Sequence, residues 1–201
     1  MGKDFRKSLQ LFVLLFTGNP NDKFIFASTH GNLDVVKKLF LDRRITSDSI
    51  DKAIIKASQN GHTKVVKLLL QSDRVDIPMN NNYAILQASQ NGHSEIVTLF
   101  LDDGHTDPSA WDNKAIREAS DNGNSEVVRL LLEDGRADPS AGNNYAIQRA
   151  SEKGHYKIVK LLLKDGRADP SAGDNYALYW AEKNEHAKVA KLLKDNRVLV
   201  Q

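Results

Sequence analysis

Apolar residues occur along the chain in blocks that repeat at nearly constant intervals. The dipeptide Ala-Ser holds the same place in the blocks, starting at Ala27, Ala57, Ala88, Ala119 and Ala150, with Ala181-Glu182 in the sixth. Successive alanines are 30 residues apart once and 31 residues apart four times. A fixed period of about 20–50 residues is typical of proteins built from stacked repeat units. We therefore predict a solenoid of about six units.

Each block predicts two short helices, and residues 143–173 show the pattern clearly. Small residues such as Ala146 and Ala150 in the first helix favour close approach by another helix. We expect Asn143 or Asn144 to cap this helix, because an asparagine side-chain oxygen accepts from a first-turn N–H. Gly154 is expected to end it.

The second helix of the block is more apolar than the first. Its apolar residues, between Ile158 and Leu163, form a stripe wider than a surface helix requires. We therefore expect it to pack both on its partner helix and on the next unit. Gly166 fits the left-handed residue that ends many helices. Pro170 cannot continue a helix and is expected to direct the chain into the next unit.

The run from Ala150-Ser151 through Gly154-His155 to Gly166 resembles an ankyrin repeat, whose usual wording is A-A-x-x-G-H-x-E-V-V-x-L-L-L-x-x-G. The resemblance extends over nearly the whole chain after about residue 20. The helix-ending glycine recurs at Gly31, Gly61, Gly92, Gly123 and Gly154. Membership of this family implies an all-α ankyrin-repeat solenoid. It also implies recognition of a protein partner through the concave face and the loop tips, with no cofactor.

Two features depart from the consensus sequence of ankyrin repeats. The T-P-L-H opening, which ties neighbouring turns together, is replaced by sequences such as Tyr145-Ala146-Ile147-Gln148. The period of 31 is shorter than the usual one of about 33. We therefore expect short finger loops, such as residues 138–141, with little β-hairpin. The D-P-S-A and N-Y-A-I wording resembles the ankyrin proteins of giant DNA viruses of amoebae, which implies a viral protein acting in the host cytoplasm.

The repeats predict one continuous domain behind a lone capping helix in residues 1–20. The units are expected near residues 21–48, 49–79, 80–110, 111–141, 142–172 and 173–201. A secretory signal is the alternative for the first segment, because basic residues precede a short apolar run. Asp4 and the lack of a cleavage pattern disfavour it. The apolar tail at Val198 leaves open that the chain is a fragment of a longer protein.

Charge and cysteine content narrow the classes of partner. The chain has 28 basic and 26 acidic residues, a formal charge of +2, and no cysteine. This balance does not favour nucleic acid or an anionic membrane as partner, and no stretch is long enough to span a bilayer. Without cysteine there is neither a disulfide framework nor a thiolate metal site. We expect a cytoplasmic monomer.

Histidines and acidic residues, which could act in catalysis or metal binding, recur at equivalent positions of successive units. Such recurrence favours a structural role. His62, His93, His155 and His186 occupy the same turn of their units, so we expect them to form turn hydrogen bonds. Acids recur at helix ends and loop starts, where they cap turns through backbone N–H groups. They are Asp103, Asp107, Asp134, Asp138, Asp165 and Asp169. No catalytic, metal or dinucleotide motif is found, so we predict neither an enzyme nor a metal protein.

Positions that vary between units are the candidates for binding a partner. One column precedes each Ala-Ser, and a second set lies at the loop tips. The resulting candidates are Met79, Asn80, Gln87, Trp111, Asp112, Glu118, Asn143, Arg149, Asp174 and Trp180. Trp111 stands where the next two units have Gly142 and Gly173, so it either anchors an interface or stacks on a neighbouring loop. Trp180 either binds a partner or seals the C-terminal cap.

These observations favour a scaffold that binds a protein partner without catalysis. Three alternatives are a targeting arm of a larger adaptor, an engineered repeat protein and a hydrolase with a hidden site. The unequal units argue against engineering. The lack of a converging nucleophile, base or metal set argues against the hydrolase.

Overall fold

A computed structural model describes residues 18–71 and 78–198, and the side chains at 78–81 and 197–198 fall outside that description. Of the capping helix expected over residues 1–20, residues 1–17 lie outside the described residues. The first described helix, α2, begins at Pro20, after the Asn19 side chain accepts a hydrogen bond from the Asn21 N–H at 2.9 Å.

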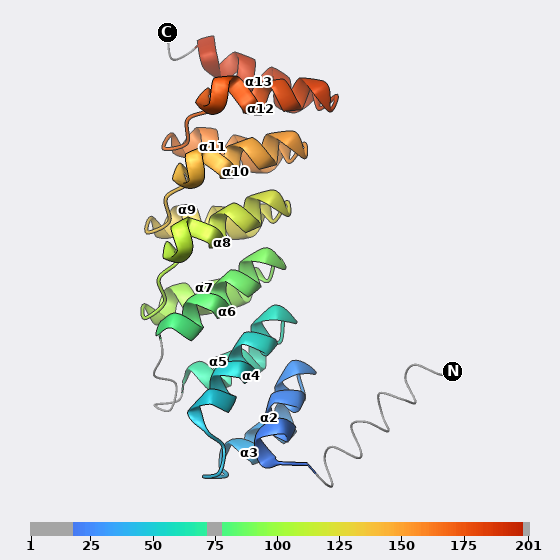
Figure 1. Cartoon of the computed structure of the whole chain (residues 1–201), viewed down its shortest axis with the longest axis vertical. Coiled ribbons are helices and arrows are strands. Elements are labelled where there is room, and N and C mark those ends of the chain that lie inside the picture. Colours follow the sequence, from blue (N-terminus) through green and yellow to red (C-terminus); the bar gives the residue numbers. More distant parts are fainter. Residues whose placement is uncertain (1–17, 72–77, 199–201) are drawn as a thin grey trace, which may run out of the picture. The chain divides into compact units, whose positions relative to one another are not determined.

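Every regular element in the described ranges is an α-helix, which confirms the all-α prediction (Figure 1). The described ranges hold twelve helices, which form six consecutive pairs. The first three pairs are α2 (Pro20–Thr29) and α3 (Leu33–Phe40), α4 (Ser47–Gln59) and α5 (Thr63–Leu70), and α6 (Pro78–Gln90) and α7 (Ser94–Asp103). The last three are α8 (Ala110–Asp121) and α9 (Ser125–Asp134), α10 (Ala141–Glu152) and α11 (Tyr156–Asp165), and α12 (Ala172–Lys183) and α13 (Ala187–Val198).

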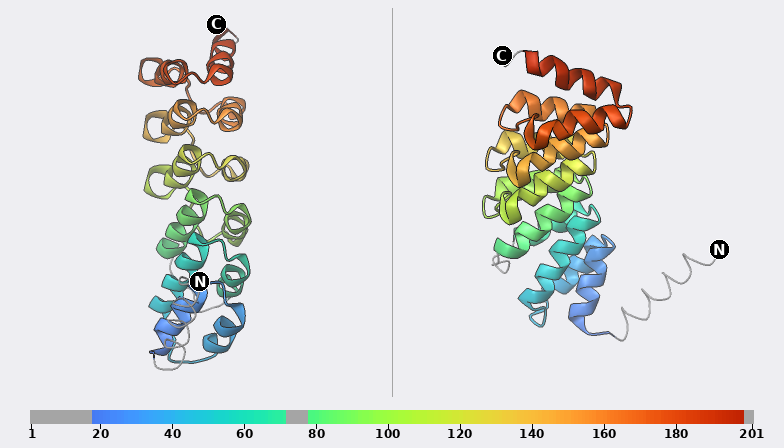
Figure 2. Two further views of the ribbon diagram at one scale, coloured as in Figure 1. Left: turned by 90° about the vertical axis from the view of Figure 1, so that its right-hand side faces the viewer. Right: turned by 45° about the horizontal axis from the view of Figure 1, so that its top comes forward.

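The chain divides into two compact units between Ala84 and Ile85. In the first unit, α4 packs on α2 and α5 packs on α3. In the second unit, α8, α10 and α12 lie side by side as a row of first helices, and α9, α11 and α13 form a row of second helices (Figure 2). This arrangement within the second unit brings together side chains that are about one repeat apart in the sequence.

In the pair α8 and α9, the core combines two buried alanines and the fully buried Ile116 on the first helix with larger residues on the second. In α8, Ala115 and Ala119 are buried, and in α9 Val128 and Leu131 are fully buried. The small alanines let the two helices approach, so the larger side chains of the second helix fill the space between repeats. The neighbouring Leu132 is only half-buried.

Within each compact unit, the turn between the two helices of a repeat contacts the same turn of the neighbouring repeat. Gly154 has a φ of +73°, as expected for a glycine that ends a helix. A Cβ there would lie 2.6 Å from Nδ1 of His186 in the next repeat. The Nε2–H of His186 donates to the carbonyl of Glu152 at 3.0 Å. The recurring histidine is therefore structural, as predicted, and its hydrogen bond crosses to the preceding repeat.

The first helix of each of the last three repeats opens on a left-handed turn that the sequence did not predict. Gly142, Asn143 and Asn144 all have φ near +60°. The expected cap by Asn143 or Asn144 is wrong, because Ser140 stands at the N-cap and no side chain caps the helix. Instead, Oδ1 of Asn144 accepts the backbone N–H of Asp169 in the next finger loop at 2.7 Å. The asparagine joins repeats and does not cap its own helix.

The finger loops are held by local turns and by bonds to the preceding finger. Oδ1 of Asp138 accepts both the N–H and the hydroxyl of Ser140, at 2.8 and 2.7 Å. Arg136 pairs with Asp134 at 2.8 Å and donates to the carbonyl of Thr106 in the preceding loop at 2.9 Å. The hydrogen bond from Arg136 lowers the pKa of Asp134. The predicted turn-capping role is confirmed for Asp107, Asp134, Asp138, Asp165 and Asp169, whereas Asp103 contacts the His105 side chain. The bonds between fingers stand in for the missing T-P-L-H ties.

The serine of the Ala-Ser dipeptide is buried without a hydrogen-bond partner in each of its five copies, Ser28, Ser58, Ser89, Ser120 and Ser151. A buried hydroxyl that makes no hydrogen bond destabilises the folded state. We expect Ser120→Ala to raise the free energy of unfolding by about 1 kcal/mol, measured by urea denaturation. Ser125→Ala, at the half-exposed start of α9, is the control. Loss of stability in Ser120→Ala would mean that this hydroxyl does make a hydrogen bond, which would contradict the account.

Candidate binding face

A continuous band of aromatic and basic side chains crosses the first helices of the second unit. The band runs from α8 to α12 through Arg117, Tyr145, Arg149, Tyr176, Trp180 and Lys183. Successive members contact one another or share a carboxylate. Because they come from three repeats, the stacking of the first helices brings them together.

At the α8 end, Arg117 links the left-handed turn to the band. Its Nη1 donates to the carbonyl of Asp112 at 3.1 Å and to Oδ2 of the same residue at 2.8 Å. Its guanidinium lies 4.8 Å from the ring centroid of Tyr145, within cation–π range. Trp111 lies in the turn itself, with a φ of +53° and 46% of its surface exposed.

The middle of the band is an ion network that spans α8 and α10. Nε of Arg149 lies 2.7 Å from Oδ1 of Asp121, and its Nη1 lies 2.6 Å from Oε2 of Glu152. Lys153 binds the other oxygen of Asp121 at 2.9 Å. Partial burial acts to raise the pKa of Asp121, but hydrogen bonds from Lys153 and Arg149 lower it overall. The network therefore keeps Asp121 ionised and holds Arg149 in place.

At the α12 end, Trp180 is surrounded by other rings and a lysine. Tyr176 lies 5.8 Å away between ring centroids, and Tyr179 contacts the indole edge-on at 5.5 Å. Nζ of Lys183 lies 4.3 Å from the Trp180 centroid. The hydroxyl of Tyr176 donates to Oε2 of Glu152 at 3.2 Å, which connects this cluster to the ion network.

The candidate residues fall into three groups. Trp111, Asp112, Asn143 and Asp174 are exposed in the left-handed turns, and Gln87, Glu118, Arg149 and Trp180 are half-buried on first helices. Met79 and Asn80 begin α6, and their side chains lie outside the described residues. Within the second unit the structure joins Arg149 to Trp180 through Glu152 and Tyr176.

Four members of the band were missed by the sequence reasoning: Arg117, Tyr145, Tyr176 and Lys183. The available signal was the spacing of Tyr145 and Tyr176 four residues before Arg149 and Trp180, because such residues share a helix face. Arg117 and Lys183 gave no comparable signal, since a lone basic residue on a helix is usually solvated.

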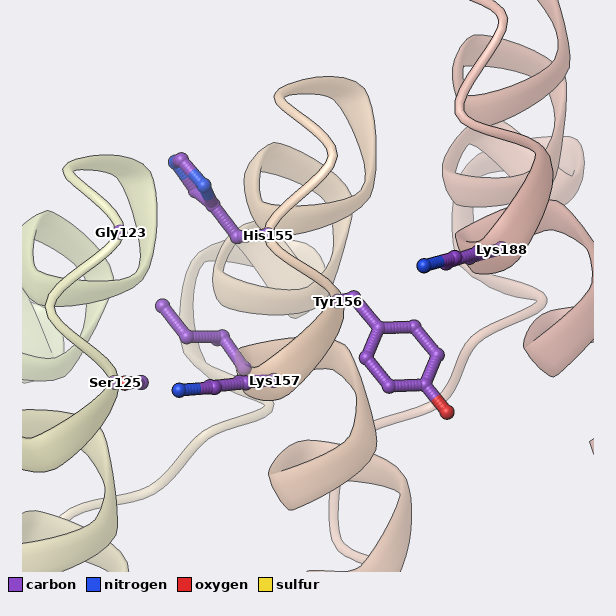
Figure 3. A pocket seen from close by; sticks show the side chains of 7 residues that line it. Gly123, Ser125, His155, Tyr156, Lys157 and Lys188 are labelled. Atoms are coloured by element: carbon purple, nitrogen blue, oxygen red, sulfur yellow. The ribbon is translucent and has the colours of Figure 1, made fainter.

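A separate hollow of about 570 Å³ lies beside the second helices. Figure 3 shows Lys157 extending towards Ser125, and Tyr156 lying between its own helix and Lys188. The His155 ring is already used, because its Nε2–H donates to the carbonyl of Asp121 at 3.2 Å. The hollow offers basic and hydroxyl groups but no nucleophile paired with a base, so it does not form a catalytic arrangement.

The residues that the structure describes contain no group of three or more His, Cys, Asp or Glu side chains able to hold a metal ion. No helix in the same ranges is both long and apolar enough to cross a membrane.

Comparison with known families identifies the repeats. Ankyrin repeats, described as a set of three copies, match residues 24–112, 85–174 and 116–200. The chain belongs to the ankyrin-repeat family. No curated protein matches it in sequence. Ankyrin repeats are general protein–protein interaction modules, and the family is typically non-enzymatic.

Proposed function

We propose that this ankyrin-repeat chain is a non-enzymatic scaffold that binds one protein partner. The partner contacts the band on α8, α10 and α12 and the left-handed turns beside it. Ankyrin repeats supply the class of function, and the distribution of aromatic and charged side chains supports the choice of face.

The left-handed conformation and the exposure of Trp111 carry the proposal. A left-handed conformation costs a residue other than glycine about 1–2 kcal/mol. The two equivalent positions in the next repeats are Gly142 and Gly173, with φ of +61° and +63°. Here the chain places its largest type of side chain and leaves 46% of it exposed. The backbone conformation disfavours this choice, whereas tryptophan is enriched among the residues that dominate binding energy.

The ion network supports the same face because it limits side-chain motion before binding. Arg149 is held by two carboxylates, and Tyr176 shares one of them. Side chains that are already ordered lose less entropy when a partner binds. The band therefore presents its rings and charges at positions set by the stacked helices.

The setting of this interaction is part of the proposal. The recurring D-P-S-A sequence motif supports a viral source. The absence of cysteine supports the cytoplasm of the host as the place of action. We propose that the chain acts as a monomer there, alone or as the targeting arm of a larger adaptor.

Replacing Trp111 with glycine separates recognition from folding. We expect Trp111→Gly to leave the free energy of unfolding unchanged or to raise it by about 1 kcal/mol, because the left-handed strain is relieved. Capture of the protein partner from an extract of the producing cells should fall to background. The two readouts are urea denaturation and quantitative mass spectrometry of the captured proteins.

Tyr156→Ala is the matched control, because Tyr156 is also a partly exposed ring but lies beside the second helices. Capture should survive in this control. If Trp111→Gly captured the same proteins as the original chain, the proposed face would be wrong. If Trp111→Gly unfolded the protein, Trp111 would be a packing residue.

A further inference from the structure

We propose that the partner contacts the α12 end of the band with an acidic segment, carboxylates beside an apolar side chain. This inference rests on the proposed function and names the chemistry of the partner at the same face. The surface concerned is called the basic aromatic patch. It consists of three members of the band, Tyr176, Trp180 and Lys183, with the adjoining Lys153 and Tyr179.

The charged groups of the ion network are exposed to different degrees. The side chains of Asp121 and Glu152 are 18% and 21% exposed, whereas that of Lys153 is 39% exposed. The acids are also already bonded to Arg149. A molecule approaching α10 therefore meets the more exposed Lys153 ammonium before it meets the two carboxylates, although the chain as a whole is nearly neutral.

Lys183 contacts two aromatic rings. This exposed lysine lies over two rings, with Nζ 4.3 Å from the centroid of Trp180 and 5.6 Å from that of Tyr179. Among the described residues, no carboxylate forms an ion pair with it. A ring attracts a cation without neutralising its charge. The Lys183 ammonium is thus held in a fixed place with its positive charge available to an anion.

The two lysines lie on neighbouring helix ends. Nδ2 of Asn184 donates to the carbonyl of Glu152 at 2.8 Å, which brings the last turn of α12 beside the last turn of α10. Lys183 and Lys153 directly adjoin these two residues in the sequence. An extended acidic segment that crosses both helix ends would therefore meet a positive charge from each repeat.

The aromatic rings of the patch favour an apolar side chain next to the carboxylates of the partner. Tyr179 is 56% exposed and lies against the edge of Trp180. Aromatic surface next to a positive charge favours an apolar side chain beside an acidic one, because both groups are then satisfied at once. The α8 end differs, because Asp112 is 63% exposed there and Glu118 is half-buried on the same helix. At the α12 end Glu182 is 48% exposed, but Lys194 pairs with it at 2.6 Å. Charge complementarity with Lys183 and Lys153 therefore assigns the acidic segment to the α12 end.

The test uses the full, unaltered chain. The probe is a short peptide of glutamate, serine and one leucine that carries a fluorescent label, and its neutral counterpart carries glutamine in place of each glutamate. We expect the chain to raise the fluorescence anisotropy of the acidic peptide and to bind it at least about tenfold more tightly than the neutral one. Added salt should weaken this binding.

Charge variants show whether the effect belongs to the patch. Lys183→Glu should weaken binding of the acidic peptide by about tenfold or more, and Lys183→Arg should restore it, because both lysine and arginine carry a positive charge. Lys157→Glu is the matched control, because Lys157 is an exposed lysine on α11, beside the hollow. It should leave binding unchanged. Circular dichroism confirms that each variant is folded.

Several outcomes would overturn the inference. These are equal binding of the acidic and neutral peptides, no effect of Lys183→Glu, or an equal effect of Lys157→Glu. Tighter binding of a single-stranded oligonucleotide of matched charge would also overturn it, since the patch would then select nucleic acid. If the acidic peptide does not bind but Trp111→Gly still abolishes capture of a protein, the proposed function stands and the inference of an acidic segment is wrong. If the original chain captures no protein at all, both the proposed function and the inference are wrong.

Discussion

Replacing Leu131 with alanine is expected to lower the free energy of unfolding by about 2–5 kcal/mol. Leu131 is fully buried on α9, whose other buried residues include Val127 and Val128. Removing three side-chain carbons here leaves a cavity, because α9 is held between α7 and α11 and the site has little room to collapse. Urea denaturation followed by circular dichroism measures the change.

Leu132→Ala is the matched control for this prediction. Leu132 is the next residue of the same helix but is only half-buried, so its truncation removes much less buried apolar area. We expect its effect to be clearly smaller than that of Leu131→Ala. Equal effects, or a change below about 0.5 kcal/mol in Leu131→Ala, would contradict the register of the repeats.

The second large effect is expected at Gly154. Gly154→Ala introduces left-handed strain at a φ of +73° and a Cβ that would lie 2.6 Å from Nδ1 of His186. The ring must move, and its hydrogen bond to the Glu152 carbonyl is then lost. Gly166→Ala provides a comparison, because Gly166 has a φ of +84° with no atom within 4 Å of the added Cβ.

The difference between the two glycine variants isolates the contact between repeats. Gly166→Ala should lower the free energy of unfolding by about 1–2 kcal/mol from backbone strain. Gly154→Ala should lower it by at least about 1 kcal/mol more, for the lost hydrogen bond and the displaced ring. Thermal and urea denaturation provide both values. Equal values would mean that the histidine contributes nothing to the joining of repeats.

The helices were predictable because their signals are local and repeated. The Ala-Ser period and the apolar stripe of the second helix predicted six pairs, and the described helices form six pairs. Gly154 and Gly166 were assigned correctly, since a glycine after an apolar helix is a strong sign of a left-handed residue. Repetition made each of these signals stronger than any single copy.

The contacts between repeats were less predictable, because they depend on which groups become neighbours after stacking. Asn144 is a good N-cap by residue type, yet its side chain bonds Asp169 in the next finger. The three consecutive left-handed residues at Trp111, Asp112 and Asn113 were also missed. Left-handed residues normally occur singly, and tryptophan has no preference for that conformation.

In the candidate site, too, the residues could be predicted but their contacts between repeats could not. Variation between repeats selected Arg149 and Trp180, and the structure connects them through Glu152 and Tyr176. Variation could not show that Arg149 is held by Asp121 of the preceding repeat. That bond gives Arg149 a role in joining repeats as well as its proposed role in recognition.

Site-directed photo-crosslinking tests the central claim most directly. A photoreactive residue is placed at Trp111, at Tyr179 or at Tyr156, and the full chain is irradiated in an extract of the producing cells. Trp111 and Tyr179 belong to the proposed face, and Tyr156 lies beside the second helices. We predict that Trp111 and Tyr179 crosslink to the same protein and that Tyr156 does not. Crosslinking from Tyr156 alone, or from none of the three positions, would contradict a protein-binding face on α8, α10 and α12.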